Sequence, residues 1–289
     1  MSTRAGDTEA RGTDAVRFVD ERVGASPALR KALRYVFPEH WSFLLGEVAL
    51  YSFVVLLGSG IFLACFFSPD VSARVTYDGP YAPLTGTEVT KAYDSVLGLS
   101  FEVPGGLLMR QVHHWAALVF LVAIVMHLLR VFFTGAFRRP RRLTWGIGVT
   151  LMALGVLEGF AGYSLPDDLL SGMGLAIAYG VALSIPIVGG DVGSALWGGQ
   201  YPGSGVFESR LYLAHILLLP LVMIALITAH LALIVRTHHT QPAGPGRRED
   251  NVVGAPAWPT YAVRQGWSRG RSIRWCSPRS RVRRLSIHG

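Results

Sequence analysis

The residues best suited to chemistry are four histidines inside two long apolar stretches. His113 and His127 lie 14 residues apart in one stretch, and His215 and His230 lie 15 residues apart in the other. A neutral imidazole binds iron well and is a common axial ligand of haem. Polar groups inside membrane-spanning segments are costly and usually functional. The four histidines therefore indicate iron ligands, whereas a single one would more simply hydrogen-bond to a neighbour.

The spacing places the two histidines of each stretch on one face of a helix. At about 100° per residue, 14 steps return to within roughly 40° of the start, and 15 steps to about 60°. The two histidines of a helix are then roughly 21–22 Å apart along its axis. If the two helices run in the same direction, His113 and His215 share one depth. His127 and His230 then share the other, and the two facing pairs would hold two stacked haems.

Two other residue types recur at the same depths. Arg110 lies three residues before His113, and Arg130 lies three residues after His127. Arginine is the natural partner of a haem propionate, because its guanidinium pairs with carboxylates. Snorkelling to the lipid headgroups is the alternative for each arginine.

Glycines also recur at a spacing of 14 residues, in two further apolar stretches. They are Gly46 with Gly60, and Gly148 with Gly162. Glycine lets a flat group or another backbone approach closely. We therefore expect these glycines beside the haems, although ordinary helix packing would use the same residues.

The elements that must position these side chains are four membrane-spanning helices. The chain of 289 residues is 51% apolar and only 16% charged, against about 25% charged residues in a soluble domain. A spanning helix needs about 20 apolar residues. Four runs meet this length: Trp41–Phe67, Val112–Phe133, Leu143–Leu165 and Leu211–Val235. The expected fold class is an all-α integral membrane protein, a four-transmembrane-helix bundle that holds two stacked haems.

Charges in the loops predict the orientation of these helices. Lys and Arg cluster before the first helix, after the second and after the fourth, whereas Pro69–Pro104 and Pro166–Arg210 are acidic. Because basic loops mark the cytoplasmic side, both termini of this multi-pass plasma-membrane protein are expected in the cytoplasm. The second and fourth helices then run in the same direction.

The net charge of +8 does not indicate a nucleic-acid partner. Eight arginines without any acid lie in residues 264–289 and account for all of it. The chain has two cysteines and no C-x-x-C-H motif, so covalent haem attachment is excluded.

The chain resembles the N-terminal, haem-bearing half of cytochrome b from cytochrome bc complexes, in its actinobacterial form. The resemblance depends on the segments SGIFLA, RQVHHWAA, MHLLRVFFTGAFRRPR, GFAGYSLPDD, SIPIVG and AHLALIVR. It implies two non-covalent b-type haems. His113 and His215 would ligate a low-potential haem near the outer face. His127 and His230 would ligate a high-potential haem near the inner face.

The same resemblance implies a function and partners. The chain would pass electrons from quinol, expected to be menaquinol, through the two haems to menaquinone, coupled to proton translocation. Its partners would be a Rieske iron–sulfur subunit and a di-haem cytochrome c subunit in a dimeric complex. Gly174 and Pro186 would line the outer quinol site, and no residue receives a catalytic role. The alternatives are the di-haem membrane anchor of another oxidoreductase and a membrane protein without a cofactor.

The expected organisation has four parts. Residues 1–26 form a cytoplasmic arm, 27–240 the di-haem domain, 241–262 a cytoplasmic connector and 263–289 a basic tail. The Pro-(Glu/Asp)-Trp-Tyr motif of the family does not occur. After Ala262 the composition changes to Arg, Ser, Gly and Trp. We favour a change of reading frame in the gene as the origin of this segment. The alternative is a native tail bound to anionic lipid. After a frame change the chain would bind haem without turning over quinol.

Overall fold

A computed structural model describes residues 36–38, 41–202, 205–240, 245 and 254–256. The chain divides into two units, residues 39–244 and a second unit of residues 1–38 with 245–289. In the second unit, strand β1 (Val36–Pro38) pairs antiparallel with β4 (Gly254–Pro256). The predicted arm and basic tail, and most of the connector, lie outside the described residues. The frame-change hypothesis therefore remains a prediction, which the downstream nucleotide sequence read in three frames would test.

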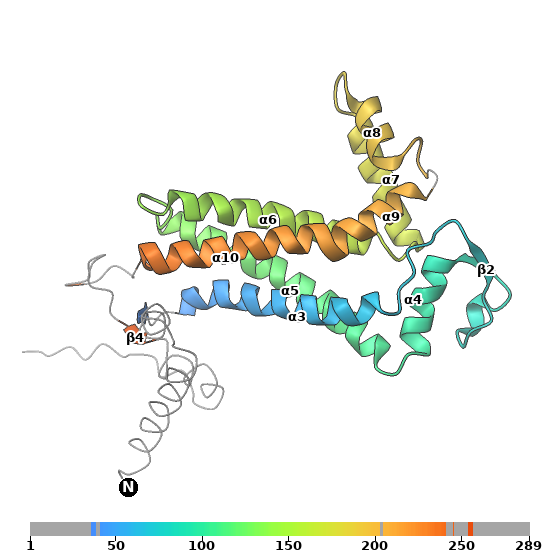
Figure 1. The fold of residues 1–289 in the computed structure, drawn as a ribbon, viewed down its shortest axis with the longest axis horizontal. Helices are drawn as coiled ribbons and strands as arrows, with labels where there is room; N and C mark the ends of the chain where they lie inside the picture. Colours follow the sequence, from blue (N-terminus) through green and yellow to red (C-terminus); the bar gives the residue numbers. More distant parts are fainter. Residues whose placement is uncertain (1–35, 39–40, 203–204, 241–244, 246–253, 257–289) are drawn as a thin grey trace, which may run out of the picture. The chain divides into compact units, whose positions relative to one another are not determined.

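Four long apolar helices dominate the unit of residues 39–244 (Figure 1). The first is α3 (Leu44–Ala64), which continues the 3-10 turn η1 (Trp41–Phe43). The second and third are α5 (Gly106–Phe133) and α6 (Arg142–Tyr163). The fourth is assembled from α9 (Val206–Leu213), the π-helical turn η3 (Ala214–Leu218) and α10 (Leu219–Thr237). The expected all-α bundle with four candidate transmembrane helices is confirmed.

The helix bounds differ from the apolar runs mainly at two N-termini. The second helix begins at Gly106 rather than Val112, and the fourth begins at Val206 rather than Leu211. Backbone hydrogen bonding continues through polar residues such as Arg110 and Glu208, where the apolar run has already stopped. Hydropathy marks the part of a helix suited to lipid, not the whole helix.

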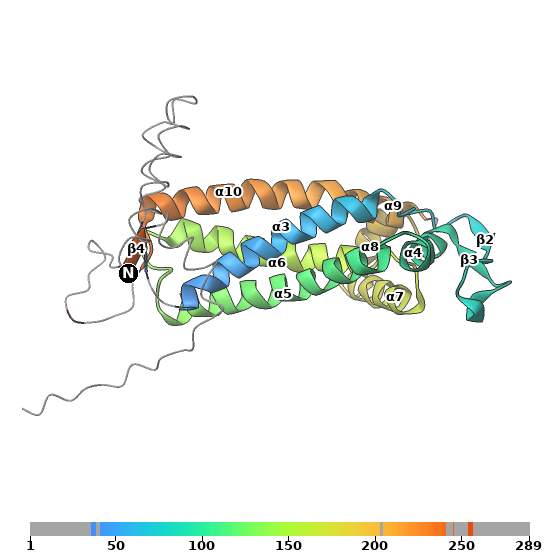
Figure 2. The same ribbon diagram turned by 90° about the horizontal axis from the view of Figure 1, so that it is seen from below.

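The four helices pack as two pairs that share a core. Helix α3 lies along α5, α6 packs against α10, and α5 also contacts α6 (Figure 2). Helices α5 and α10 run in the same direction, as the loop charges predicted (Figures 1 and 2). Phe53 and Phe120 meet at 6.0 Å between ring centroids, and the fully buried Met223 of α10 belongs to the same cluster.

This central core lies between two levels of histidines. Phe120 is midway along α5 between His113 and His127. Gly155 of α6 makes room for its ring, because a Cβ there would lie 2.9 Å from Phe120 Cε1. Buried apolar side chains from all four helices therefore pack together between the two levels.

Shorter elements gather at the end of the bundle where α5 begins (Figure 1). They are β2 (Arg74–Thr76) paired with β3 (Glu88–Thr90), η2 (Ala82–Leu84), α4 (Lys91–Phe101), α7 (Leu169–Leu183) and α8 (Gly189–Trp197). Asp168 caps α7 by accepting a hydrogen bond from Ser171 N at 2.7 Å. Trp197 of α8 stacks on Phe207 of α9 with centroids 4.5 Å apart. This contact anchors the start of the helix that carries His215.

An arginine clasp joins two elements at the opposite end. Arg141, just before α6, donates from Nε to the His238 carbonyl at 2.9 Å and from Nη2 to the Thr237 carbonyl at 3.3 Å. Cations at a helix C-terminus satisfy its free carbonyls and favour its dipole. The turn between α5 and α6 is thereby joined to the end of α10, the helix that carries His230.

Candidate functional site

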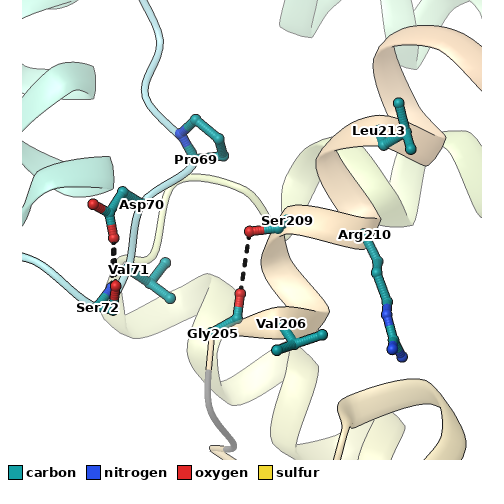
Figure 3. Close-up of a pocket in the computed structure, with 9 residues that line it drawn as sticks. All are labelled: Pro69, Asp70, Val71, Ser72, Gly205, Val206, Ser209, Arg210 and Leu213. Carbon is teal, nitrogen blue, oxygen red and sulfur yellow. Dashed lines mark hydrogen bonds between the residues drawn. The ribbon is translucent and has the colours of Figure 1, made fainter.

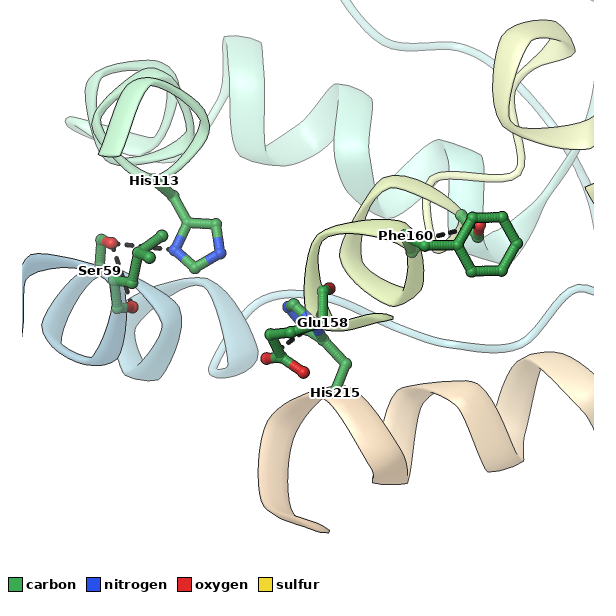
Figure 4. Close-up of polar contacts among 7 residues, drawn as sticks. Ser59, His113, Glu158, Phe160 and His215 are labelled. Atoms are coloured by element: carbon green, nitrogen blue, oxygen red, sulfur yellow. Dashed lines mark hydrogen bonds and ion pairs between the residues drawn. The ribbon is translucent and has the colours of Figure 1, made fainter. Parts of the chain in front are cut away.

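His113 of α5 and His215 of η3 lie opposite each other (Figure 4), and we call them the first pair. Their ring centroids are 6.1 Å apart and their planes are inclined by 77°. An imidazole nitrogen binds a metal at about 2.0–2.1 Å, so one ion between two imidazoles requires centroids about 6 Å apart. The first pair therefore has the separation that a single iron ligated on both sides needs.

Hydrogen bonding determines which nitrogen of His113 is available. Its Nδ1 lies 2.9 Å from Ser59 Oγ (Figure 4). The Ser59 hydroxyl donates its proton to the Val55 carbonyl at 2.7 Å, so its oxygen accepts from His113 Nδ1–H. Nε2 then carries the lone pair, and it is the nitrogen that can bind iron.

The same reasoning applies to His215. Its Nδ1 lies 3.2 Å from the backbone carbonyl of Glu158 and 3.1 Å from Oε1 of the same residue. A carbonyl only accepts hydrogen bonds, so Nδ1 carries the proton and Nε2 is again the available nitrogen. Both histidines of the first pair thus have an Nε2 atom whose lone pair can bind iron.

Glycines make room for both imidazoles of the first pair. A Cβ on Gly162 of α6 would lie 2.5 Å from His215 Cε1, which is closer than atoms can approach. A Cβ on Gly60 of α3 would lie 3.3 Å from His113 Cε1. Each predicted glycine at this level is therefore in contact with one predicted histidine.

The second pair, His127 and His230, also has a glycine beside each imidazole, at the other level. A Cβ on Gly46 would lie 3.2 Å from His127 Cε1, and one on Gly148 would lie 3.6 Å from His230 Cε1. Gly148 is equally close to Leu128, the neighbour of His127 in α5, so α6 lies between the two histidine-bearing helices. Nδ1 of His127 is buried and has no hydrogen-bond partner in the described part of the chain.

A π-helical turn explains the spacing of 15 residues in the fourth helix. Leu219 N donates to Ala214 O, an i→i+5 bond, so η3 holds one residue more than an α-turn would. The extra residue offsets the 60° misalignment that a regular helix would give His215 and His230. Pro220 follows and lacks the N–H that an α-helix would direct to the Ile216 carbonyl, which favours such a break.

The two predicted arginines lie at opposite ends of α5. The guanidinium carbon of Arg130 is 4.0 Å from the centroid of the Phe43 ring, a cation–π contact. Arg130 Nε is buried and makes no hydrogen bond to any described residue, so a buried donor near His127 suits an added carboxylate such as a propionate. Arg110 donates from Nη1 to Ser100 Oγ of α4 at 3.0 Å.

The two residues predicted for the outer quinol site are Gly174 in α7 and Pro186 in the turn after it. Gly174 faces Tyr163, because a Cβ there would lie 2.9 Å from its Cε1. Tyr163 in turn donates from its hydroxyl to the Leu170 carbonyl at 2.9 Å. Pro186 is exposed beyond the end of α7, and Gly174 lies about 13 Å of helix before that end.

A hollow near the start of the fourth helix contains none of the predicted ligands (Figure 3). Asp70 there accepts hydrogen bonds from Ser72 Oγ, Ala73 N and Ser72 N, and these hold the pKa of its carboxyl below the usual range. The lining consists of Pro69, Asp70, Val71, Ser72, Gly205, Val206, Ser209, Arg210 and Leu213. It is formed by the segment after α3 and by the first turns of the fourth helix.

Sequence reasoning missed the two groups that hold Nδ1 of the first pair. Glu158 carried a signal, because an acidic residue inside an apolar span is usually functional. Ser59 carried none, since a serine one residue before a helix glycine is common in packed helices. In the described residues no three or more His, Cys, Asp or Glu come together as a metal cluster. The histidines stand instead in twos, the number of axial ligands that a haem iron takes.

The fold and the site define a membrane helix bundle with histidines paired at two levels. Residues 118–269, more than half of the chain, match the family described as cytochrome b (N-terminal)/b6/petB. The chain belongs to this family, which confirms the resemblance inferred from the sequence motifs. Membership of a cytochrome b family implies a haem protein, and the chain is an integral membrane protein. The alternative of a different di-haem membrane anchor is not favoured.

Curated relatives agree with this assignment. The chain is 55% identical over 249 residues to the "cytochrome bc1 complex cytochrome b subunit" of Mycobacterium tuberculosis, covering 86% of this chain and 45% of that protein. It is 49% identical over 255 residues to the protein of the same name from Streptomyces coelicolor, covering 88% and 46%. The chain thus spans about half the length of the curated relatives it matches.

A solved structure supports the fold. A chain of a structure titled "Hyperthermophilic respiratory Complex III" superposes with a TM-score of 0.69 at 23% identity, covering 87% of this chain and 63% of that one. At this identity the likeness concerns the arrangement of the helices alone.

Proposed function

We propose that this chain carries electrons across the membrane as the cytochrome b subunit of a respiratory quinol:cytochrome c reductase. The observation that carries the proposal is the first pair, with rings 6.1 Å apart and with both Nδ1 atoms hydrogen-bonded. In this proposal His113 and His215 hold one non-covalent b-type haem. His127 and His230 hold a second.

Each set of residues has a distinct part in holding these groups. Haem iron, when bound, alternates between two oxidation states and so carries one electron at a time. The four histidines would hold the iron through their imidazole nitrogens, and the four glycines leave space for the imidazoles and for a flat group beside them. Arg110 and Arg130 supply positive charge at the two ends of α5 for carboxylate groups. The apolar core around Phe120 lies between the two levels.

The proposed substrate and partners are those that the sequence resemblance implies. Proteins of this family from actinobacteria are named as subunits of a bc1 complex, which supports a multi-subunit assembly. We infer menaquinol as donor, menaquinone as acceptor, and a Rieske iron–sulfur subunit and a di-haem cytochrome c subunit as partners in a dimeric complex. The loop charges support a plasma-membrane location with both termini in the cytoplasm, and proton translocation accompanies the electron transfer.

The haem content of the purified chain tests this proposal. A pyridine haemochrome assay should give about two haems per chain, since there are two pairs with two axial ligands each. Replacing His113 or His215 by Ala should remove one and the same haem. Replacing His127 or His230 should remove the other.

His114 is the matched control for these variants. It neighbours His113, lies about 100° further around the helix, and its exposed ring contacts Trp115 at 6.1 Å. His114→Ala should therefore keep both haems. Haem content near zero in the unaltered chain, or loss of haem in His114→Ala with retention in His113→Ala, would show that the assignment is wrong.

A further inference from the structure

The two ligands of the first pair differ in the group beside Nδ1. His113 faces the neutral hydroxyl of Ser59, whereas His215 faces the carboxylate of Glu158 at 3.1 Å (Figure 4). At the second pair, Nδ1 of His127 has no hydrogen-bond partner among the described residues. The acidic partner of His215 thus sets the first pair apart from His127 at the other level.

The contact between Glu158 and His215 depends on the helical spacing of Glu158 and Gly162 in α6. Glu158 lies four residues before Gly162, one turn away on the same face of the helix. Because Gly162 has no side chain, the ring of His215 lies against the backbone of α6. Nδ1 is thereby brought within 3.2 Å of the Glu158 carbonyl and 3.1 Å of its carboxylate.

The carboxylate is placed where a charge is expensive. The side chain of Glu158 is 20% exposed and that of His215 is 16% exposed, inside a helix of membrane-spanning length. The second carboxylate oxygen, Oε2, is buried and unpartnered within the described residues. An acidic group in such a position is usually retained for function, and Oε1 of Glu158 contacts a proposed iron ligand.

We propose that Glu158 is a positioning residue that orients His215 and lowers the midpoint potential of the haem held by the first pair. This inference rests on the proposed ligation by His113 and His215. A carboxylate beside Nδ1–H makes the imidazole a stronger electron donor and keeps the ring in one orientation. Its negative charge also favours the more positive ferric iron over ferrous iron, more strongly in a medium of low dielectric.

The test is a redox titration of both haems in membranes that contain the full chain. Glu158→Gln keeps the size of the side chain and removes its charge. The ratio of ferrous to ferric iron at the first pair should rise tenfold or more at a given ambient potential, which is an upward shift of about 59 mV for a one-electron couple. The potential of the haem at the second pair should stay unchanged and serves as internal reference.

Two further variants separate charge from structure. Glu158→Asp keeps the charge and should restore most of the low potential, even where Glu158→Gln assembles poorly. Ser59→Ala removes the neutral group beside His113 and should shift the potential less than Glu158→Gln does. The low-spin ferric signal in electron paramagnetic resonance should change for the first pair in Glu158→Gln and not for the second.

The outcomes distinguish this inference from the proposed function. Two haems with an unchanged first-pair potential in Glu158→Gln, or equal shifts in Glu158→Gln and Ser59→Ala, would overturn the role of Glu158 alone. An upward shift of the first-pair midpoint potential that is as large in Glu158→Asp as in Glu158→Gln would also overturn it. Absence of haem from the unaltered chain would instead refute the proposed function.

Discussion

The imidazole of His215 lies so close to the backbone of Gly162 that a Cβ at this glycine would stand 2.5 Å from Cε1. This contact joins α6 to the fourth helix at the level of the first pair. It also explains why no larger residue fits there, because the atom on the other side is part of a ring held by Glu158. The contact leads directly to a measurable consequence.

Gly162→Ala should displace His215 and weaken haem binding at the first pair. Overpacking a tight site costs about 1–3 kcal/mol, and every 1.4 kcal/mol is tenfold in affinity. The haem content of the purified variant, measured by difference spectra, should fall at the first pair only. Gly146→Ala in the same helix is the control, since a Cβ there meets nothing within 4 Å. Equal haem content in the two variants would contradict the proposed contact.

The π-helical turn of the fourth helix gives a second prediction. Deleting Leu217 from η3 should convert the turn to regular α-helix and keep His215 and His230 on one face, so both haems should be retained. Deleting Ile224 from α10 leaves the turn in place and rotates His215 by about 100° relative to His230. Both residues are exposed, so the lost packing is comparable. Haem loss in both deletions would show that the turn does not compensate for the extra residue.

Much of this architecture could be predicted from the sequence, because the signals are strong and local. Runs of about 20 apolar residues identify spanning helices, since hydrocarbon permits little else. The 14-residue spacing of Gly46 and Gly60 agrees with their contacts to His127 and His113. The relative direction of α5 and α10 followed from the charges of the loops.

Other features depend on tertiary contacts that no local pattern encodes. The interpretation of 15 residues between His215 and His230 assumed a regular helix, whereas η3 absorbs one residue. Gly174 and Pro186 were assigned to one quinol site by resemblance, and this assignment stays a prediction, because Gly174 lies within α7 and Pro186 follows its end. The place of Glu158 beside His215 requires the packing of two helices 57 residues apart in sequence. Such pairings become visible only when the helices are assembled.

The arginine clasp gives a third prediction. Arg141→Ala removes two hydrogen bonds to the carbonyls of Thr237 and His238, so the end of α10 should loosen. A hydrogen bond of this kind contributes about 1 kcal/mol. The second-pair haem should therefore be lost at a lower detergent concentration than in the unaltered chain, while the first-pair haem is released as before. Arg139→Ala, an exposed arginine of the same turn, should behave like the unaltered chain.

The last prediction concerns Arg130, whose guanidinium lies 4.0 Å over Phe43 and whose Nε is buried without a hydrogen bond to the described residues. If this donor pairs with a propionate, Arg130→Gln removes a positive charge near the second-pair haem. Loss of this charge favours ferric iron, so the midpoint potential of that haem should fall. Arg130→Lys keeps the charge, and its midpoint potential should stay close to that of the unaltered chain. Phe43→Leu leaves the charge of Arg130 in place but removes the cation–π contact, which is worth about 0.5–2 kcal/mol, and the edge contact of Phe43 with the His239 ring at 5.6 Å. It should weaken haem retention more than it shifts the potential. Redox titration of the three variants gives the order of their midpoint potentials. A potential that is lower in Phe43→Leu than in Arg130→Gln would show that the ring, and not the charge, controls this site.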